Sequence, residues 1–279
     1  MPTARYRDVT AGGARLRVSD SGSGAPVVLL HGLFMDHLTW SGVGAELSED
    51  FRVIAPDLPG FGDSEKPPPS RFAYTFDAFA SCVAGLYAGL DVGRAALVGH
   101  GLGGAIAIAI AARHAELVSR LVLINPSCFI TQADYSRRIA AFPLLGGLMF
   151  KQLLGRGSFR MYFREALTNG VSLDPARLDH YYSCFNSPAA RGSALATLRA
   201  TRDTRPIIAN TAHIQVPTLV VWGRHDRLCP SGFGQKLSRR IAGAGFELMN
   251  SGHSPQEEQP AELARVLKGF LKAERASMF

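Results

Sequence analysis

The sequence is poor in cysteine and has no long hydrophobic run. Its four cysteines, Cys82, Cys128, Cys184 and Cys229, form no C-x-x-C pair and no spacing typical of zinc. We therefore expect buried thiols rather than disulfides or a metal site, and no motif implies a cofactor. The longest apolar run, AIAIAIAA at 105–112, is too short to cross a bilayer. Because the first residues also lack the apolar segment of a secretory signal, we expect a cytoplasmic protein without a membrane span.

The formal net charge of +7 is concentrated in one part of the chain. Residues 129–210 contain eleven Lys and Arg against five Asp and Glu, a surplus of six. No basic cluster is interleaved with aromatic residues, so the pattern does not indicate a nucleic-acid partner. Two interpretations stay open: a solvated basic surface, or a positive field that attracts an anionic small-molecule substrate. The sequence carries no signal for the oligomeric state.

Short aliphatic runs alternate with longer helical stretches over the first 125 residues. Strands separated by helices of this length indicate right-handed crossovers and a mostly parallel sheet, which is the α/β class. The first two strands, joined by TAGG, suit a hairpin at the sheet edge. Residues 128–210 are helical and irregular, and the strand–helix rhythm returns with TLVVWG at 218–223. The sequence therefore predicts a core of residues 1–127 and 211–279, interrupted by a helical lid over 128–210.

The segment LVGHGLGGAIA, residues 97–107, has the form of a strand-to-helix turn. In hydrolases such a turn carries a nucleophile in the pattern G-x-S-x-G, with glycines that let the strand and the helix approach closely. Gly99, Gly103 and Gly104 supply those glycines, but the nucleophile position is Gly101. The following AIAIAIA alternates like a strand, yet its place after the turn favours a helix buried on all sides. A dinucleotide-binding turn is disfavoured, because no acidic residue follows at the expected distance.

Two residues follow later strands in the order that a catalytic acid and histidine would take. Asp226 lies after TLVVWG, and His253 lies after the strand expected near FELMN. From these loops a carboxylate can orient an imidazole. The HGL turn after APVVLL would aim the N–H of Leu33 at the same point as the N–H of Leu102, and two such donors form an oxyanion hole. His31 is expected to stabilise that turn rather than to catalyse.

With these motifs the chain resembles the α/β-hydrolase superfamily over nearly its whole length. The segment APDLPGFGDSEKP at 55–67 looks like the D-x-P-G-x-G-x-S loop of that superfamily, in which Asp57, Gly60, Gly62 and Ser64 are expected to be structural. The chain is most similar to lidded esterases, lactonases and carbon–carbon bond hydrolases. The resemblance implies an α/β-hydrolase fold: a mostly parallel eight-stranded sheet flanked by helices, with an inserted helical lid over the cavity.

The resemblance also implies a small or medium hydrophobic ester, lactone or ketone-type substrate. The candidate substrate-binding residues lie beside the two turns or in the lid: Phe34, His100, Phe129, Phe142, Leu145 and Met149. The lid residues among them are equally well explained as the lid's own core.

The departure from the superfamily is Gly101, which offers no nucleophilic atom. Acyl-enzyme turnover is expected to be nearly absent, because loss of a triad serine lowers turnover roughly a million-fold. Three interpretations stay open: an inactivated serine hydrolase, a general-base dyad of Asp226 and His253 that works without a covalent intermediate, or a non-catalytic, receptor-like binder of small molecules. Three other residues are not expected to replace the serine: Ser251, Ser254 and Cys229.

Overall fold

The chain folds around a single eight-stranded sheet in the order β1-β2-β4-β3-β5-β6-β7-β8. The computed structural model describes residues 4–129, 155–168, 170–171 and 173–273. The β1–β2 and β2–β4 pairs are antiparallel, and the other five neighbouring pairs are parallel. The strands are β1 (Arg5–Ala11), β2 (Ala14–Ser21), β3 (Pro26–Leu30), β4 (Arg52–Pro56), β5 (Ala95–His100), β6 (Val118–Ile124), β7 (Thr218–Gly223) and β8 (Gly245–Met249). The predicted mostly parallel eight-stranded α/β fold is confirmed.

Burial explains the two kinds of strand. The central strand β5 is buried at every residue because helices cover both faces of the sheet, so its sequence is continuously apolar up to the turn. In contrast, β2 alternates between buried and more exposed residues, as expected near a sheet edge. The predicted edge hairpin is present, with Gly12 and Gly13 joining β1 to β2.

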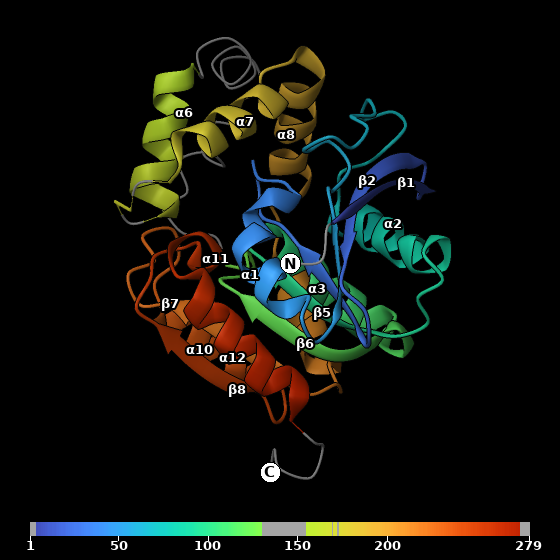
Figure 1. Cartoon of the computed structure of the whole chain (residues 1–279), viewed down its shortest axis with the longest axis vertical. Coiled ribbons are helices and arrows are strands. Elements are labelled where there is room, and N and C mark those ends of the chain that lie inside the picture. The colour runs from blue at the N-terminus through green and yellow to red at the C-terminus, as the bar shows by residue number, and fades with distance from the viewer. Residues whose placement is uncertain (1–3, 130–154, 169, 172, 274–279) are drawn as a thin grey trace.

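Helices cover the sheet on two sides (Figure 1). On one face, α1 and α12 pack against β3 and β4. On the other face, α2, α3 and α10 pack on the sheet and enclose the larger of the two apolar clusters. The helices of the described residues are α1 (Ser41–Leu47), α2 (Phe76–Gly89), α3 (Leu102–Arg113), α6 (Arg156–Tyr162), α7 (Pro175–Phe185), α8 (Pro188–Ala200), α9 (Arg205–Asn210), α10 (Gly232–Arg240), α11 (Pro255–Glu258) and α12 (Pro260–Lys272). No helix in the described ranges is long and apolar enough to span a membrane.

The alternating AIAIAIA segment is helical. It lies in α3, where every residue from Leu102 to Ala111 is buried. A helix enclosed on all sides needs no polar face, so the period of the apolar residues carries no information about its secondary structure. The position of the segment after the glycine-rich turn predicted the helix correctly.

The helices α6, α7 and α8 gather at one end of the molecule, above the sheet in Figure 1. Aromatic side chains join α6 and the residues after it to α7: the ring of Phe159 stacks on Phe185 at 5.4 Å, and the ring of Phe163 stacks on Tyr181 at 5.5 Å. The helix α9, inside the range predicted for the lid, packs against α3. The lid limits at 128 and 210 stay predictions.

Candidate active site

The turn between β5 and α3 is shaped by close backbone approach. A Cβ atom on Gly99 would lie 2.3 Å from the carbonyl oxygen of Gly103, and a Cβ on Gly103 would lie 2.4 Å from the carbonyl oxygen of Leu30. Neither position has room for a side chain. The strand and the helix therefore meet as the glycine spacing predicted.

Gly101, at the tip of this turn, has a strained backbone but an open environment. Its φ of 55° and ψ of −115° are accessible to glycine and costly for other residues. A Cβ on Gly101 would lie 3.5 Å from the Cα of Gly32, 3.6 Å from Nε2 of His253 and 3.7 Å from Oγ of Ser127. These are ordinary contact distances, so the space beside Gly101 can hold a small side chain and faces the imidazole.

Asp226 and His253 form a buried pair. Nδ1 of His253 lies 2.8 Å from Oδ2 of Asp226, and each residue is 6% exposed. Burial by itself would raise the pKa of Asp226, but the charge of His253 and the hydrogen bonds to the carboxylate outweigh it, so the pKa is lowered. The ionised carboxylate accepts the Nδ1–H of the imidazole, which directs Nε2 toward the space at Gly101.

Three further donors hold the Asp226 carboxylate in place. The side-chain amide of Asn125 donates to Oδ2 at 2.6 Å, and the backbone N–H groups of Leu228 and Cys229 donate to Oδ1 at 2.8 and 2.9 Å. Asn125 is the first residue after β6, so the acid is fixed from a neighbouring strand as well as from its own loop. The geometry is that of a rigidly oriented base.

Two other residues fix the loop that carries His253. His100 donates its Nε2–H to the carbonyl oxygen of His253 at 2.9 Å, and burial lowers the pKa of His100 to about 3, so its ring is neutral. The carboxylate of Glu258 accepts the N–H of Gly252 at 2.7 Å and the N–H of Ser254 at 3.2 Å. The His253 backbone is thus held on both sides of the imidazole.

A cavity of about 40 Å³ lies against the turn, enough for about three water molecules, since one water needs about 10–15 Å³. Leu33 and Leu102 both line it, and neither N–H donates to a backbone carbonyl within the described residues. The structure therefore brings both predicted oxyanion donors to the cavity that His253 faces. The lining residues are Leu33, His100, Gly101, Leu102, Ser127, Tyr162, Leu167, Leu198, Thr201, Leu228 and His253.

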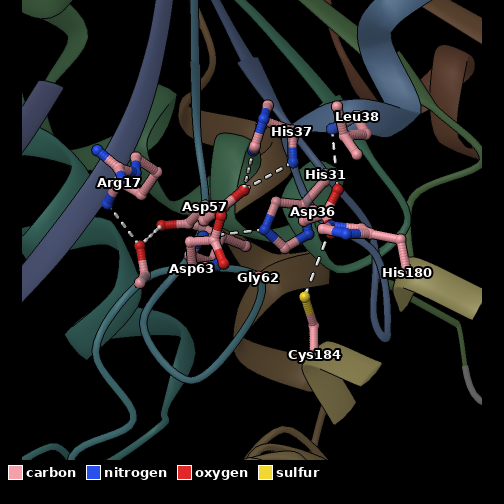
Figure 2. Close-up of polar contacts among 12 residues, drawn as sticks. Arg17, His31, Asp36, His37, Leu38, Asp57, Gly62, Asp63, His180 and Cys184 are labelled. Carbon is pink, nitrogen blue, oxygen red and sulfur yellow. Dashed lines mark hydrogen bonds and ion pairs between the residues drawn. The ribbon is translucent and has the colours of Figure 1, made fainter. Parts of the chain in front are cut away.

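The residues expected to be structural hold the neighbouring loops. The N–H of Leu58 donates to Nε2 of His31 at 2.9 Å, so the ring hydrogen is on Nδ1, which donates to the carbonyl oxygen of Gly32 at 2.8 Å. The fully buried Asp57 carboxylate accepts hydrogen bonds from the backbone and ring of His37 and from the N–H of Asp63 (Figure 2). These contacts fix the HGL turn and the loop after β4.

The predicted substrate-binding residues are only partly brought together. His100 lines the cavity, whereas Phe34 packs against the rings of Phe159, Tyr162 and Phe185, and Phe129 packs against Phe233 of α10 at 4.7 Å. Phe34 and Phe129 are not among the residues that line the cavity. Three predicted residues lie outside the described part of the chain: Phe142, Leu145 and Met149.

Ser127 is the residue that sequence reasoning missed. It follows β6, its N–H donates to the carbonyl oxygen of Gly101 at 2.8 Å, and it lines the cavity. Because β5 and β6 are adjacent parallel strands, the residues that follow β6 had to lie beside the turn. The position of Ser127 just after β6 was therefore the signal in the sequence that could have identified it. Three residues weighed as replacements for the serine do not line the cavity: Ser251, Ser254 and Cys229.

Two groups of side chains in the described residues bring three metal-ligating atoms within 4.8 Å of one another. One consists of Asp36, His180 and Cys184, and the other of Asp36, His37 and Asp57. The sequence predicted no metal site, because its four cysteines have no spacing typical of zinc. Asp36 is distant from His180 and Cys184 along the chain. The fold alone makes these clusters visible.

An eight-stranded sheet with a glycine-rich turn after β5, an acid after β7 and a histidine after β8 defines an α/β-hydrolase fold. The chain belongs to the alpha/beta hydrolase family, whose sequence profile it matches over residues 27–266.

Relatives with known sequences and structures span nearly the whole chain. The chain is 30% identical to 2-hydroxymuconate semialdehyde hydrolase of Pseudomonas sp. strain CF600, over 95% of this chain and 93% of that protein. It is 29% identical to an uncharacterized protein of Mycobacterium tuberculosis strain H37Rv, over 97% and 81% of the two chains. The crystal structure of CarC, a serine hydrolase involved in carbazole degradation, superposes with a TM-score of 0.81 at 26% identity and covers 96% of this chain and 99% of that one.

Proposed function

We propose that Asp226 and His253 act as a general-base dyad that cleaves a small hydrophobic ester, lactone or ketone-type substrate without an acyl-enzyme. The observation that carries the proposal is the position of His253: its Nε2 lies 3.6 Å from where a Cβ on Gly101 would be, beside a cavity with room for water. The hydrogen bond from Nδ1 to Asp226 keeps Nε2 as the basic nitrogen. The similarity to hydrolases supports a carbonyl substrate.

In the proposed reaction a water molecule occupies the space beside Gly101. His253 removes a proton from this water as its oxygen bonds to the substrate carbonyl carbon, and Asp226 stabilises the imidazolium that forms. The N–H groups of Leu33 and Leu102 donate to the developing oxyanion. When the carbonyl re-forms and the bond to the leaving group breaks, His253 returns the proton to that group. All steps use groups that line the cavity or contact His253.

Ser127 would assist by orienting the water. Its Oγ lies 3.7 Å from the same Cβ position and so approaches the proposed water site from the side of β6. A hydroxyl both donates and accepts a hydrogen bond, so it can hold a water with a lone pair toward the substrate. We assign it a positioning role.

The test compares the chain with its His253→Ala, Asp226→Asn and Ser127→Ala variants on a panel of aryl esters, lactones and vinylogous diketones. We expect His253→Ala to lower kcat by about 10²–10⁴-fold, as for other general bases. Ser127→Ala should lower kcat by a smaller factor, whereas Ser254→Ala, which removes a buried hydroxyl that does not line the cavity, should leave kcat unchanged. Intact-mass spectra during turnover should show no covalent adduct. An adduct, or equal rates for the chain and His253→Ala, would contradict the proposal.

A non-catalytic binder is the second candidate, and the lack of any side chain at Gly101 favours it. In that case the cavity would bind ligands with equal affinity in the chain and in His253→Ala, and neither protein would turn over any compound faster than buffer. Retention of an oriented base that a receptor does not need counts against it.

The basic surplus between residues 129 and 210 supports an anionic substrate. If positive charge attracts the substrate, kcat/KM for a carboxylate-bearing compound should fall as ionic strength rises, because salt screens exposed charges. A neutral analogue of the same size is the control. Equal salt dependence of the two compounds would contradict this assignment.

A further inference from the structure

A second cluster of reactive side chains lies away from the Asp226–His253 pair, between α7 and the loop after β3. His180 and Cys184 are one turn apart on the same side of α7, and Asp36 is in the loop that follows β3. Nε2 of His180 lies 2.9 Å from Oδ2 of Asp36 and 3.5 Å from Sγ of Cys184. Figure 2 shows the carboxylate and the thiol approaching the same imidazole. None of the three residues lines the cavity at Gly101.

Hydrogen bonding satisfies this cluster incompletely. Nε2 of His180 carries either one hydrogen or one lone pair, so it can donate to Asp36 or accept from Cys184, but it cannot do both. If Nε2–H donates to Asp36, the Cys184 sulfur can only share that same hydrogen, in a weak interaction. A cation between the three atoms would bind all of them at once.

The charges near the cluster favour a cation. Asp36 is 1% exposed; within the described residues its Oδ1 accepts only the N–H of Leu38, and its Oδ2 faces His180. Asp63 and Asp57 lie close enough to His180 to add negative charge there. Lys66 is the nearby opposing charge, and its ammonium donates to the carbonyl oxygens of Gly62 and Ser64. Three carboxylates thus act on the site, opposed by Lys66 and offset in part by the hydrogen bonds of His37 to Asp57.

A small cavity lies beside two of the three residues, and His180 does not line it. It has a volume of about 10 Å³, and Asp36 and Cys184 both line it, together with residues of the loop after β4. This is close to the space that one water molecule occupies, at about 10–15 Å³. The cluster therefore has room for one further small ligand.

We propose that Asp36, His180 and Cys184 bind a divalent zinc ion, with a water molecule as the fourth ligand. A carboxylate, an imidazole and a thiolate are a ligand set that suits Zn²⁺, whereas Mg²⁺ and Ca²⁺ prefer oxygen ligands alone. Zinc lies about 2.1 Å from nitrogen and oxygen ligands and about 2.3 Å from sulfur. In a tetrahedral site the nitrogen is therefore about 3.6 Å from the sulfur and about 3.4 Å from the oxygen. The observed 3.5 Å matches the first distance, and the observed 2.9 Å needs to open by about 0.5 Å.

Zinc at this site would join α7 to the loop after β3. Cys184 binds zinc as the thiolate, so binding releases the thiol proton to solvent as the Zn–S bond forms, and no redox step is involved. The inference is independent of the proposed function, because it concerns different residues.

The test begins with chelator-treated, reduced protein of the full chain. Equilibrium dialysis against zinc chloride followed by elemental analysis should give one zinc per chain. Cobalt(II) should bind in its place and give a thiolate-to-metal charge-transfer band. We expect Cys184→Ser and His180→Gln to weaken zinc binding by at least about 100-fold, since loss of an outer partner alone costs about 10–100-fold. Asp36→Asn, whose amide oxygen can still accept the N–H of Leu38, should weaken it as well.

Matched controls test whether the loss of zinc binding is specific to Asp36, His180 and Cys184. His213→Ala removes an exposed imidazole outside the cluster and should bind zinc like the unmodified chain. Circular dichroism should show that each variant keeps its helices, because the side chains of His180 and Cys184 are only partly buried. Zinc well below one per chain, a cobalt complex without the charge-transfer band, or unchanged binding in Cys184→Ser and His180→Gln would each overturn the proposal.

Discussion

A Cβ atom on Gly101 would lie 3.6 Å from Nε2 of His253, and apart from its chain neighbours the nearest described atom is the Cα of Gly32 at 3.5 Å. A hydroxyl on that carbon would therefore fall within hydrogen-bonding reach of a base that Asp226 already orients. The space beside Gly101 and the orientation of His253 thus suit a nucleophile at this position, and substitutions at residue 101 probe the site directly.

Gly101→Ser should create acyl-enzyme chemistry. Because a triad serine accounts for roughly a million-fold in turnover, we expect ester hydrolysis to rise by at least about 10³-fold. A fluorophosphonate should label Gly101→Ser stoichiometrically and should not label residue 101 in the unmodified chain. Gly101→Ala and the double variant Gly101→Ser/His253→Ala are the controls, and both should stay inactive as acyl-enzymes. Failure to label would mean that the turn is not in hydrolase geometry.

The same position should show a stability cost. At φ 55° and ψ −115° a residue with a Cβ is strained, so Gly101→Ala and Gly101→Ser should each lower the free energy of unfolding by about 1–3 kcal/mol. Gly269→Ala, at an exposed position within α12, should instead raise it by about 0.5–1 kcal/mol. Urea unfolding at neutral pH measures both. Stabilisation by Gly101→Ala would show that the turn is relaxed.

His100 should make the protein sensitive to acid. Its folded pKa of about 3 lies below the unfolded value of 6.5, so between these pH values the unfolded chain binds a proton that the folded chain does not. Stability then rises with pH, and it is lost as pH falls from 6.5 toward 3, at up to about 1.4 kcal/mol per pH unit. His100→Gln, which keeps a donor for the carbonyl of His253, should lose stability less steeply. If the urea midpoints of the unmodified chain and of His100→Gln fall equally steeply between pH 7 and pH 4.5, the acid sensitivity does not come from His100.

Arg177 should stabilise the docking of α7 on the core. Its guanidinium donates to the Leu38 carbonyl at 2.9 Å, to the Ser41 hydroxyl at 2.6 Å and to the Glu257 carboxylate at 3.1 Å. Glu257 is 3% exposed, so Arg177→Met would leave a buried carboxylate without its cationic partner, although the Tyr181 hydroxyl still donates to it, and would lower the free energy of unfolding by about 1–3 kcal/mol.

The pH dependence of that loss identifies its cause. Burial already raises the pKa of Glu257, and loss of the arginine would raise it further. Glu257 would then be more ionised in the unfolded state than in the folded state over a wider range of pH. The destabilisation caused by Arg177→Met should therefore be larger at pH 8 than at pH 5. Arg164→Ala, which removes an exposed ion pair with Glu165, should change stability by less than about 0.5 kcal/mol at both pH values. A pH-independent loss would indicate lost packing instead.

The fold was largely predictable because its signals are local. Buried strands such as β5 are continuously apolar, and the glycines at 99 and 103 stand where the backbone excludes a side chain. The pairing of Asp226 with His253 followed from the order of strands and loops. Contacts that depend on three-dimensional proximity were not predictable in this way. Ser127 needed the adjacency of β5 and β6, and the approach of His180 to Asp36 joins segments far apart in sequence.

The helix α3 begins at Leu102, directly at the cavity, and the alignment of its peptide dipoles carries a further consequence. A helix presents about half a positive charge at its first turn, and this charge comes from peptide groups rather than from side chains. An enolate, a carboxylate or an oxyanion at the cavity therefore meets a favourable potential whatever residue stands at position 101. The positive potential that α3 contributes at this cavity is thus a property of the backbone and does not depend on the side chain at residue 101.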